Sequence, residues 1–275
     1  MKKLLCVACA IVLGGAVSGY AEEPAAPQTA PALQKKEETA EGPFKLDAMV
    51  DIYSAYVWRG CVINDRPVWQ PSLTTGYRFD DFGTISANAW SNFDITGRNH
   101  QRSGLGLNEF DYSADYTLDI SDFAVKFGHM WYTYPKVNGD DYWKTTREFY
   151  AGLAHKNEIL NPSVTAYYDY VQANGWYVQI GVNKEIEMDR FIFGGDLNLG
   201  LATDNYCETY YGRGADGGLS DFTADIYVSY ALTDHLSIGA TLAWTSLLGT
   251  DARANEAAGW DEDCLWGGVN LKASF

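Results

Sequence analysis

The sequence predicts an all-β protein, a transmembrane antiparallel up-and-down β-barrel of about twelve strands. Three observations predict it. Apolar and polar residues alternate with a period of two, the connections alternate between short turns and longer loops, and aromatic residues gather near both ends of the apolar faces. The 275 residues are 47% hydrophobic and 15% aromatic, which is far more apolar material than a disordered chain contains.

The N-terminus has the layout of a secretory signal peptide over residues 1–21. Two lysines precede a short apolar run, and small residues lead to a cleavage site after Ala21. Residues 22–43 are rich in Pro and Ala and hold almost nothing to bury, so we expect a flexible periplasmic segment there. The barrel is therefore expected over residues 44–275. Apart from the signal peptide, no stretch of the sequence approaches the roughly 18 consecutive apolar residues of a membrane helix.

The first expected strand shows the alternation. Leu46, Val50 and Ile52 share one parity, and Lys45 and Asp51 share the other. A strand places the two sets on opposite faces, whereas a helix would scatter the charges around its circumference. The pattern recurs to the C-terminus and predicts strands at 45–59, 68–79, 83–94, 106–118, 123–133, 145–156, 163–170, 176–187, 191–202, 222–232, 236–246 and 264–275.

The connections between these strands alternate in length. Tight turns such as Asp80-Asp81 separate longer loops, which fall at 60–67, 95–105, 134–144, 171–175, 203–221 and 247–263. Short turns at one end and long loops at the other are typical of outer-membrane barrels. We therefore expect an outer-membrane location in a Gram-negative type envelope, with the short turns and the N-terminal segment periplasmic and the long loops extracellular.

Aromatic residues on the apolar parity form two groups, as expected for girdles at the two bilayer interfaces. The long-loop group is Trp58, Trp69, Phe93, Phe110, Trp131, Phe149, Tyr170, Trp176, Phe222 and Trp244, and the short-turn group is Phe79, Tyr116, Phe123, Phe191, Tyr230 and Phe275. The terminal Phe275 resembles the aromatic signal by which bacterial outer-membrane barrels are recognised for assembly. It implies the barrel-assembly machinery and outer-membrane lipids as partners.

A short motif lies at the first expected hairpin. Ser54-Ala55-Tyr56-Val57-Trp58-Arg59-Gly60 is followed by a returning strand that starts at Pro67. This resembles the TorF-like porin family, whose first strand carries a Ser-x-Tyr-x-x-Arg-Gly signature. The resemblance implies a fold and a compartment rather than a transported molecule, and Cys61 to Asn64 depart from the small polar residues expected there.

The inward parity is polar and mostly acidic, which favours a pore for small hydrophilic, cationic or neutral solutes. A twelve-stranded bore should be narrow, because barrel diameter grows with strand number, so side chains filling it is an open alternative. For Arg59, a salt bridge to a lumen carboxylate is favoured over a charged gate. The residues expected to line the pore are Asp47, Asp51, Arg59, Trp90, Glu109, Asp111, Asp115, Lys126, Glu148, Tyr167, Asp169, Tyr177, Asp196, Asp225, Tyr227 and Lys272.

Two other function classes stay open. A non-conducting barrel could display its loops as an adhesin or scaffold. A lipid hydrolase would need Ser and His within reach on the lipid-facing wall, but His129 has no outward Ser on either adjacent strand, so no enzyme is expected. The net charge of −16 argues against nucleic acid as a partner, and neither a cofactor nor a metal is expected, since the acidic loops lack calcium-loop spacing.

Three cysteines fall at the long-loop end of the expected barrel, in a compartment that permits disulfides. Closure of the ring sets the first strand beside the last, which favours Cys61–Cys264. The alternative pair, Cys207–Cys264, would tie the two longest loops together.

If the barrel conducts, it should prefer cations, because fixed carboxylates in a narrow bore attract counter-ions. Five of them lie in mid-strand, and their joint replacement by Asn should weaken the preference without unfolding the barrel. Reversal potentials across a KCl gradient measure this, and an anion-selective wild type would contradict the assignment of the lumen. The five are Asp111, Asp115, Asp169, Asp196 and Asp225.

Overall fold

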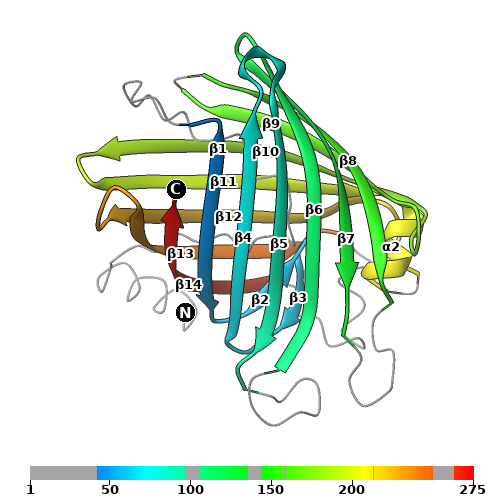
Figure 1. Ribbon diagram of the computed structural model, residues 1–275. Coiled ribbons are helices and arrows are strands. Elements are labelled where there is room, and N and C mark those ends of the chain that lie inside the picture. Colours follow the sequence, from blue (N-terminus) through cyan, green and yellow to red (C-terminus); the bar gives the residue numbers. More distant parts are fainter. Residues whose placement is uncertain (1–41, 97–105, 136–143, 158, 213, 250–262) are drawn as a thin grey trace.

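The computed structural model describes residues 42–96, 106–135, 144–157, 159–212, 214–249 and 263–275. In these residues twelve antiparallel strands form one closed barrel (Figure 1), so the predicted fold class is confirmed. The expected signal peptide and nearly all of the segment 22–43 lie outside the described residues. No helix in the described part of the chain is both long and apolar enough to cross a membrane.

The strands of the ring follow one another in chain order, and β1 closes it by pairing with both β4 and β14. At this seam the backbone of Phe275 exchanges hydrogen bonds of 2.9 Å with Leu46. The ring strands are β1 (Phe44–Tyr53), β4 (Val68–Arg78), β5 (Thr84–Asp94), β6 (Gly106–Ile120), β7 (Phe123–Thr133), β8 (Thr146–His155), β9 (Asn161–Asp169), β10 (Gly175–Met188), β11 (Phe191–Ala202), β12 (Gly218–Ala231), β13 (Leu236–Leu247) and β14 (Asp263–Ser274).

The first predicted strand, 45–59, is wrong in its second half. β1 ends at Tyr53, where it pairs with Val68 of β4, and the chain between them leaves the wall. Residues 54–67, which we call the plug hairpin, contain β2 (Tyr56–Trp58) and β3 (Cys61–Asn64), paired with each other inside the ring (Figure 1). Trp58 is consequently buried in the lumen and does not belong to the outer aromatic girdle.

The plug hairpin turns at Arg59 and Gly60, whose φ angles are +44° and +81°. Positive φ at both central residues is the signature of a type I′ turn, which matches the twist of a two-stranded hairpin. Gly60 also has no room for a side chain, since an added Cβ would lie 2.7 Å from Cδ2 of Leu247 and would collide with Asp221. The turn is therefore pressed against β12 and β13 at the long-loop end.

Among the described residues, two short helices accompany the strands. The 3₁₀ helix η1 (Asp80–Phe82) forms the first tight turn of the ring. The α-helix α2 (Asp204–Tyr210) lies in the connection that was expected to be a loop over 203–221, and β12 starts at Gly218, four residues earlier than predicted. Tyr206 and Cys207 on α2 are buried, so this connection folds onto the barrel and contributes to its interior.

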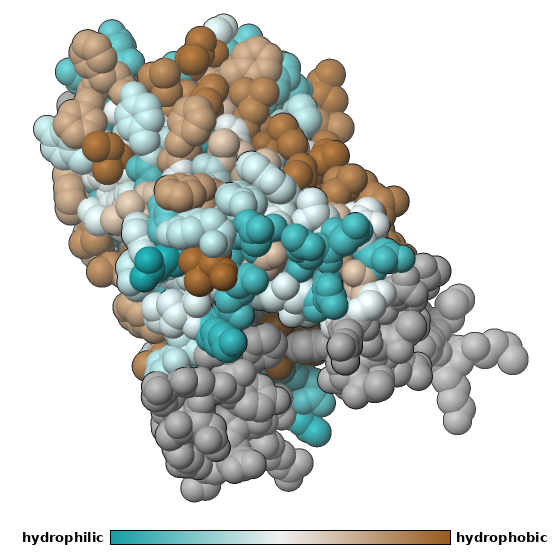
Figure 2. Space-filling model, turned by 90° about the vertical axis from the view of Figure 1, so that its right-hand side faces the viewer, coloured by the Kyte–Doolittle hydropathy of each residue, from teal (hydrophilic) through white to brown (hydrophobic). Residues whose placement is uncertain are grey.

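The outer surface carries the expected apolar belt. Leu73, Phe127, Ile180 and Leu197 are among the large apolar side chains exposed on the wall, and the outer aromatic residues other than Trp58 are exposed or half-buried. On the face in Figure 2, hydrophobic residues cover the upper part of the wall and hydrophilic residues gather below them. This distribution suits a wall surrounded by lipid over the middle of its strands.

Close packing inside the wall predicts the cost of one small substitution. A Cβ at Gly128 on β7 would overlap the ring of its register partner Tyr150 on β8, whereas one at Gly76 on β4 would make ordinary contacts of 3.6 Å or more. We expect Gly128→Ala to destabilise the barrel by about 1–3 kcal/mol, as overpacking does, and Gly76→Ala to have little effect. The fraction that resists unfolding in SDS during a temperature series measures both, and equal loss in the two variants would contradict the assigned packing.

Candidate functional site

The interior of the barrel contains every residue that was expected to line a pore. Four of these residues are half-buried, namely Asp115, Lys126, Asp225 and Lys272. Buried are Asp47, Asp51, Arg59, Trp90, Glu109, Asp111, Glu148, Tyr167, Asp169, Tyr177, Asp196 and Tyr227. Whether they line an open pathway stays a prediction, because the buried plug hairpin lies in the lumen at the end nearest the long loops.

Carboxylates dominate the charge of this interior. Among the described residues Arg59 is the one buried cation. The buried carboxylates are Asp47, Asp51, Asp94, Glu109, Asp111, Glu148, Asp169, Asp196 and Asp221. A guanidinium that enters such an interior gains attraction from many directions, and its position is then decided by the best local geometry.

Arg59, at the tip of the plug hairpin, forms a bidentate salt bridge with Glu148 on β8. Both terminal guanidinium nitrogens lie 2.9 Å from the two carboxylate oxygens, and the two side chains are 1% and 0% exposed. Tyr132 on β7 donates a further hydrogen bond of 2.8 Å to Oε2 of Glu148. Arg59 thus has the expected lumen carboxylate as its partner, but across the bore and not on a neighbouring strand.

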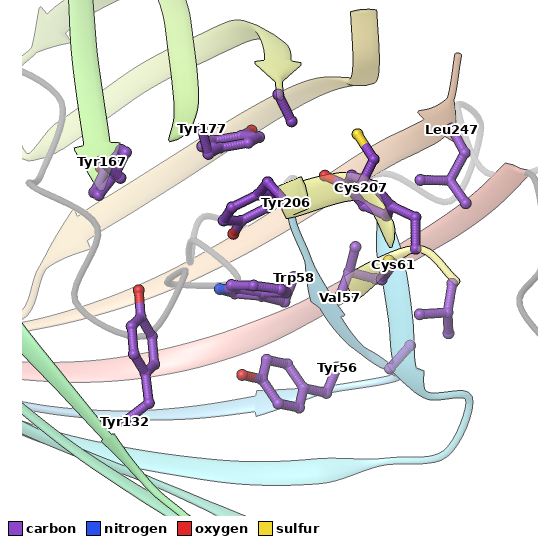
Figure 3. Packing of buried hydrophobic residues seen from close by; sticks show 14 of the residues in the cluster. Tyr56, Val57, Trp58, Cys61, Tyr132, Tyr167, Tyr177, Tyr206, Cys207 and Leu247 are labelled. Atoms are coloured by element: carbon purple, nitrogen blue, oxygen red, sulfur yellow. The ribbon is translucent and has the colours of Figure 1, made fainter. Parts of the chain in front are cut away.

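Aromatic rings surround the same guanidinium. Its Cζ lies 4.4 Å from the ring centre of Tyr167 on β9, 4.3 Å from that of Tyr177 on β10 and 4.9 Å from that of Trp58. Tyr206 on α2 contributes a fourth ring at 5.6 Å, and its hydroxyl accepts a short hydrogen bond from Arg59. Figure 3 shows Tyr167, Tyr177 and Tyr206 grouped on one side of Trp58. Desolvated cation–π contacts of this kind add to the salt bridge.

The α2 region joins the plug hairpin to the wall through its tyrosines. The hydroxyl of Tyr211 donates to the backbone carbonyl of Arg59 at 3.0 Å, and the hydroxyl of Tyr210 donates to Asp169 on β9. These residues were missing from the predicted site because they lie in a connection expected to be a loop. The spacing of Tyr206 and Tyr210, four residues apart on one helical face, was the available signal.

The body of the plug hairpin is packed by further aromatic and acidic groups. Tyr56 lies against Trp90 of β5, with ring centres 5.7 Å apart, and its hydroxyl hydrogen-bonds to Glu109 of β6. Just before the hairpin, Tyr53 at the end of β1 packs edge-on against Trp266 of β14, with ring centres 5.4 Å apart. The hairpin therefore contacts β5 and β6 through Tyr56, in addition to β8 through Arg59.

Nearer the short turns, polar side chains of the wall strands pair with one another, and the plug hairpin takes no part in these pairs. Lys126 lies 3.7 Å from Asp115. The side-chain amide of Asn183 donates to both oxygens of Asp196, which faces Asp225 across the β11–β12 ladder. Two carboxylates in direct cross-strand register repel each other, so this part of the lumen favours a positive charge.

The predicted disulfides are wrong: neither Cys61–Cys264 nor Cys207–Cys264 is formed. The pairing assumed that the first strand extends along the last one to residue 59. In the structure β3 carries Cys61 into the lumen, while Cys264 stays in the wall opposite Thr245. Burial, with nearby Asp221, raises the pKa of the Cys61 thiol well above its ordinary value, and burial raises that of Cys207 to about 11. Both thiols are therefore unreactive where they lie.

His129 faces the outer surface of β7, as expected, and its surroundings are aromatic. Its Nε2 lies 2.9 Å from the hydroxyl of Tyr170, and its ring packs on Trp131 and Phe149. No group of three or more potential metal ligands occurs among the described residues.

Comparison with known proteins gives a family and a fold. The family described as "Bacterial protein of unknown function (Gcw_chp)" matches residues 37–192, which include the plug hairpin and most of the guanidinium's partners. No curated protein matches the chain. The TorF-like resemblance of the first hairpin stays a prediction, since the match carries a different family description.

Several solved outer-membrane barrels are similar to this chain. The COG4313 outer membrane channel from Pseudomonas putida F1 superposes with a TM-score of 0.51 at 8% identity, covering 88% of this chain and 98% of that one. The NanC porin gives 0.49 at 13% identity, covering 83% and 98%, and the KdgM porin gives 0.46 at 11%, covering 84% and 99%. At these identities the likeness concerns the fold alone.

The buried salt bridge predicts how firmly the plug hairpin is seated. Glu148→Gln leaves the guanidinium of Arg59 buried without a full counter-charge, which costs about 3–5 kcal/mol when such a pair is broken. We expect the hairpin to leave the lumen more often, and Cys61, now 1% exposed, to react faster with a maleimide. Peptide mapping by mass spectrometry measures the adduct at Cys61. Glu187→Gln, at an exposed site on β10, is the control, and equal labelling rates in both variants would contradict the role of Glu148.

Proposed function

This chain belongs to the Gcw_chp family of bacterial proteins of unknown function, and we propose that it is an outer-membrane barrel through which small hydrophilic solutes, cationic or neutral, diffuse. The observation that carries the proposal is the chemistry of its interior. Nine buried carboxylates face one buried guanidinium among the described residues. If the interior served only the stability of the barrel, apolar side chains would fill it better, because charges are costly to bury.

The way the plug hairpin is attached supports passage through the bore. β1 and β4 pair with each other from Phe44↔Tyr77 to Tyr53↔Val68, so residues 54–67 are an excursion from a ladder that is complete without them. The hairpin can therefore leave the lumen while every strand of the ring keeps its neighbours. In the proposed mechanism the conformation with Arg59 on Glu148 is closed, and withdrawal of the hairpin opens the bore.

A non-conducting barrel that displays its loops, as an adhesin or scaffold, is the second candidate. It is favoured by the close packing of the plug hairpin, in which Tyr56, Trp58 and Cys61 are all buried. A lipid hydrolase is the third candidate. Its support is weaker, since the hydrogen-bond partner found for the outward His129 is a tyrosine hydroxyl and no serine. We therefore propose that the protein is not an enzyme.

The proposed location is the bacterial outer membrane, with the short turns in the periplasm and the long loops outside. The exposed apolar belt supports contact with lipid. The segment proposed to engage the barrel-assembly machinery is β14 with Phe275, the residue that follows it, whose side chain is exposed beside the seam with β1.

Recording in planar bilayers tests the proposal. We expect wild type to open rarely and Glu148→Gln to open more often, because the plug hairpin then loses its strongest anchor. Glu187→Gln should behave like wild type, since Glu187 is exposed and far along β10 from Tyr177, the β10 residue beside Arg59. A silent wild type together with a silent Glu148→Gln barrel, inserted at equal density, would favour the scaffold over the pore.

A further inference from the structure

The partners of the Arg59 guanidinium divide into two groups by their place in the fold. Trp58 belongs to the plug hairpin itself and would leave with it. Glu148 lies on β8, Tyr167 on β9, Tyr177 on β10 and Tyr206 on α2, and all four would stay behind. None of these four is more than 1% exposed. Withdrawal of the hairpin would thus uncover a carboxylate flanked by three tyrosine rings.

These four side chains are held in place by contacts that do not involve Arg59. Tyr132 donates to Glu148 at 2.8 Å, and the hydroxyl of Tyr177 donates to Asp221 at 3.2 Å. The ring of Tyr177 also packs against those of Tyr167 and Tyr206, with centres 6.1 Å and 5.7 Å apart. Groups that are fixed before a ligand arrives lose little entropy on binding, so the arrangement is suited to receive a second cation.

The geometry selects for a planar cation with paired donors. Two nitrogens of Arg59 reach the two oxygens of Glu148 at the same distance of 2.9 Å, while the rings of Tyr167 and Tyr177 lie within 4.4 Å of Cζ. A guanidinium satisfies both requirements because it is flat and presents parallel N–H groups. An ammonium is a compact, strongly hydrated charge that cannot make the paired contact.

We propose that Glu148, Tyr167, Tyr177 and Tyr206 form a binding site for the guanidinium group of a solute, and that Arg59 occupies this site in the closed barrel. The inference rests on the proposed function, since it requires that the plug hairpin can withdraw. It narrows the cationic solutes to those that carry a guanidinium group, such as arginine-like compounds. The hairpin then acts as a tethered competitor that the solute replaces.

The covalent link between Arg59 and the wall sets the concentration at which a solute should replace Arg59 in the site. A short flexible link holds its group at an effective concentration in the millimolar range. A free guanidinium solute must therefore reach millimolar concentrations to compete with Arg59. Removing the Arg59 side chain should let the same solute bind without competition.

The first experiment uses Arg59→Asn, because Asn-Gly is a favoured type I′ pair and tolerates the positive φ at residue 59. Calorimetric titration in detergent compares guanidinium chloride with methylammonium chloride at matched ionic strength. We expect guanidinium to bind at least about tenfold more tightly than methylammonium, because methylammonium cannot make the paired hydrogen bonds to Glu148. The preference should disappear in the double variant Arg59→Asn/Glu148→Gln. Equal affinities for the two cations, or a preference that survives Glu148→Gln, would overturn the site.

The second experiment uses the wild-type protein, so that it decides the matter even if Arg59→Asn does not fold. Cys61 labelling is followed with argininamide or lysinamide at about 10 mM, within the range set by the tether. We expect argininamide to speed labelling severalfold and lysinamide to leave it unchanged. Equal effects of the two, or none from either, would overturn the proposal. Guanidinium binding in a barrel that never conducts would instead count against the pore and leave the binding site standing.

Discussion

The interior of this barrel depends on the ion pair between Arg59 and Glu148. A guanidinium loses its hydration when it is buried, and only a partner with matching geometry compensates for that loss. Glu148 supplies two equal contacts of 2.9 Å, and the rings around it supply the rest. The position of the plug hairpin follows from this pair. So does that of the α2 region, because the hydroxyl of Tyr211 binds the backbone of the very residue that forms the pair.

The wall and the interior are stabilised by different forces. The wall is a closed ladder of backbone hydrogen bonds with apolar side chains outside, and it is complete across β1 and β4 without the plug hairpin. The interior is held by side-chain contacts among charged and aromatic groups from strands that are far apart in the ring. Because the wall is held by backbone hydrogen bonds and the interior by side-chain contacts, withdrawal of the plug hairpin would leave the ladder between β1 and β4 intact, as the proposed pore requires.

Much of the wall was predictable from the sequence. Alternation placed the ring strands to within a few residues, and loop lengths alternated as an up-and-down barrel requires. The same reasoning extended the first strand to residue 59, because Tyr56 and Trp58 continue its apolar parity. Apolar side chains at alternate positions fit a lipid-facing wall and a packed lumen equally well, so parity could not tell the two apart. The disulfide predictions failed with that strand, since they depended on where it placed Cys61.

The sequence by itself determined the barrel class, the strands of the wall and the acidic character of the lumen, because these depend on alternation and turn length, which are properties of short stretches of chain. The tertiary structure alone decided that residues 54–67 fold inward and that Arg59 meets Glu148, a partner 89 residues away. It also decided that Tyr206 of α2 completes the ring of aromatic side chains. Contacts across a lumen depend on the closure and curvature of the whole ring, and no local pattern in the sequence contains that information.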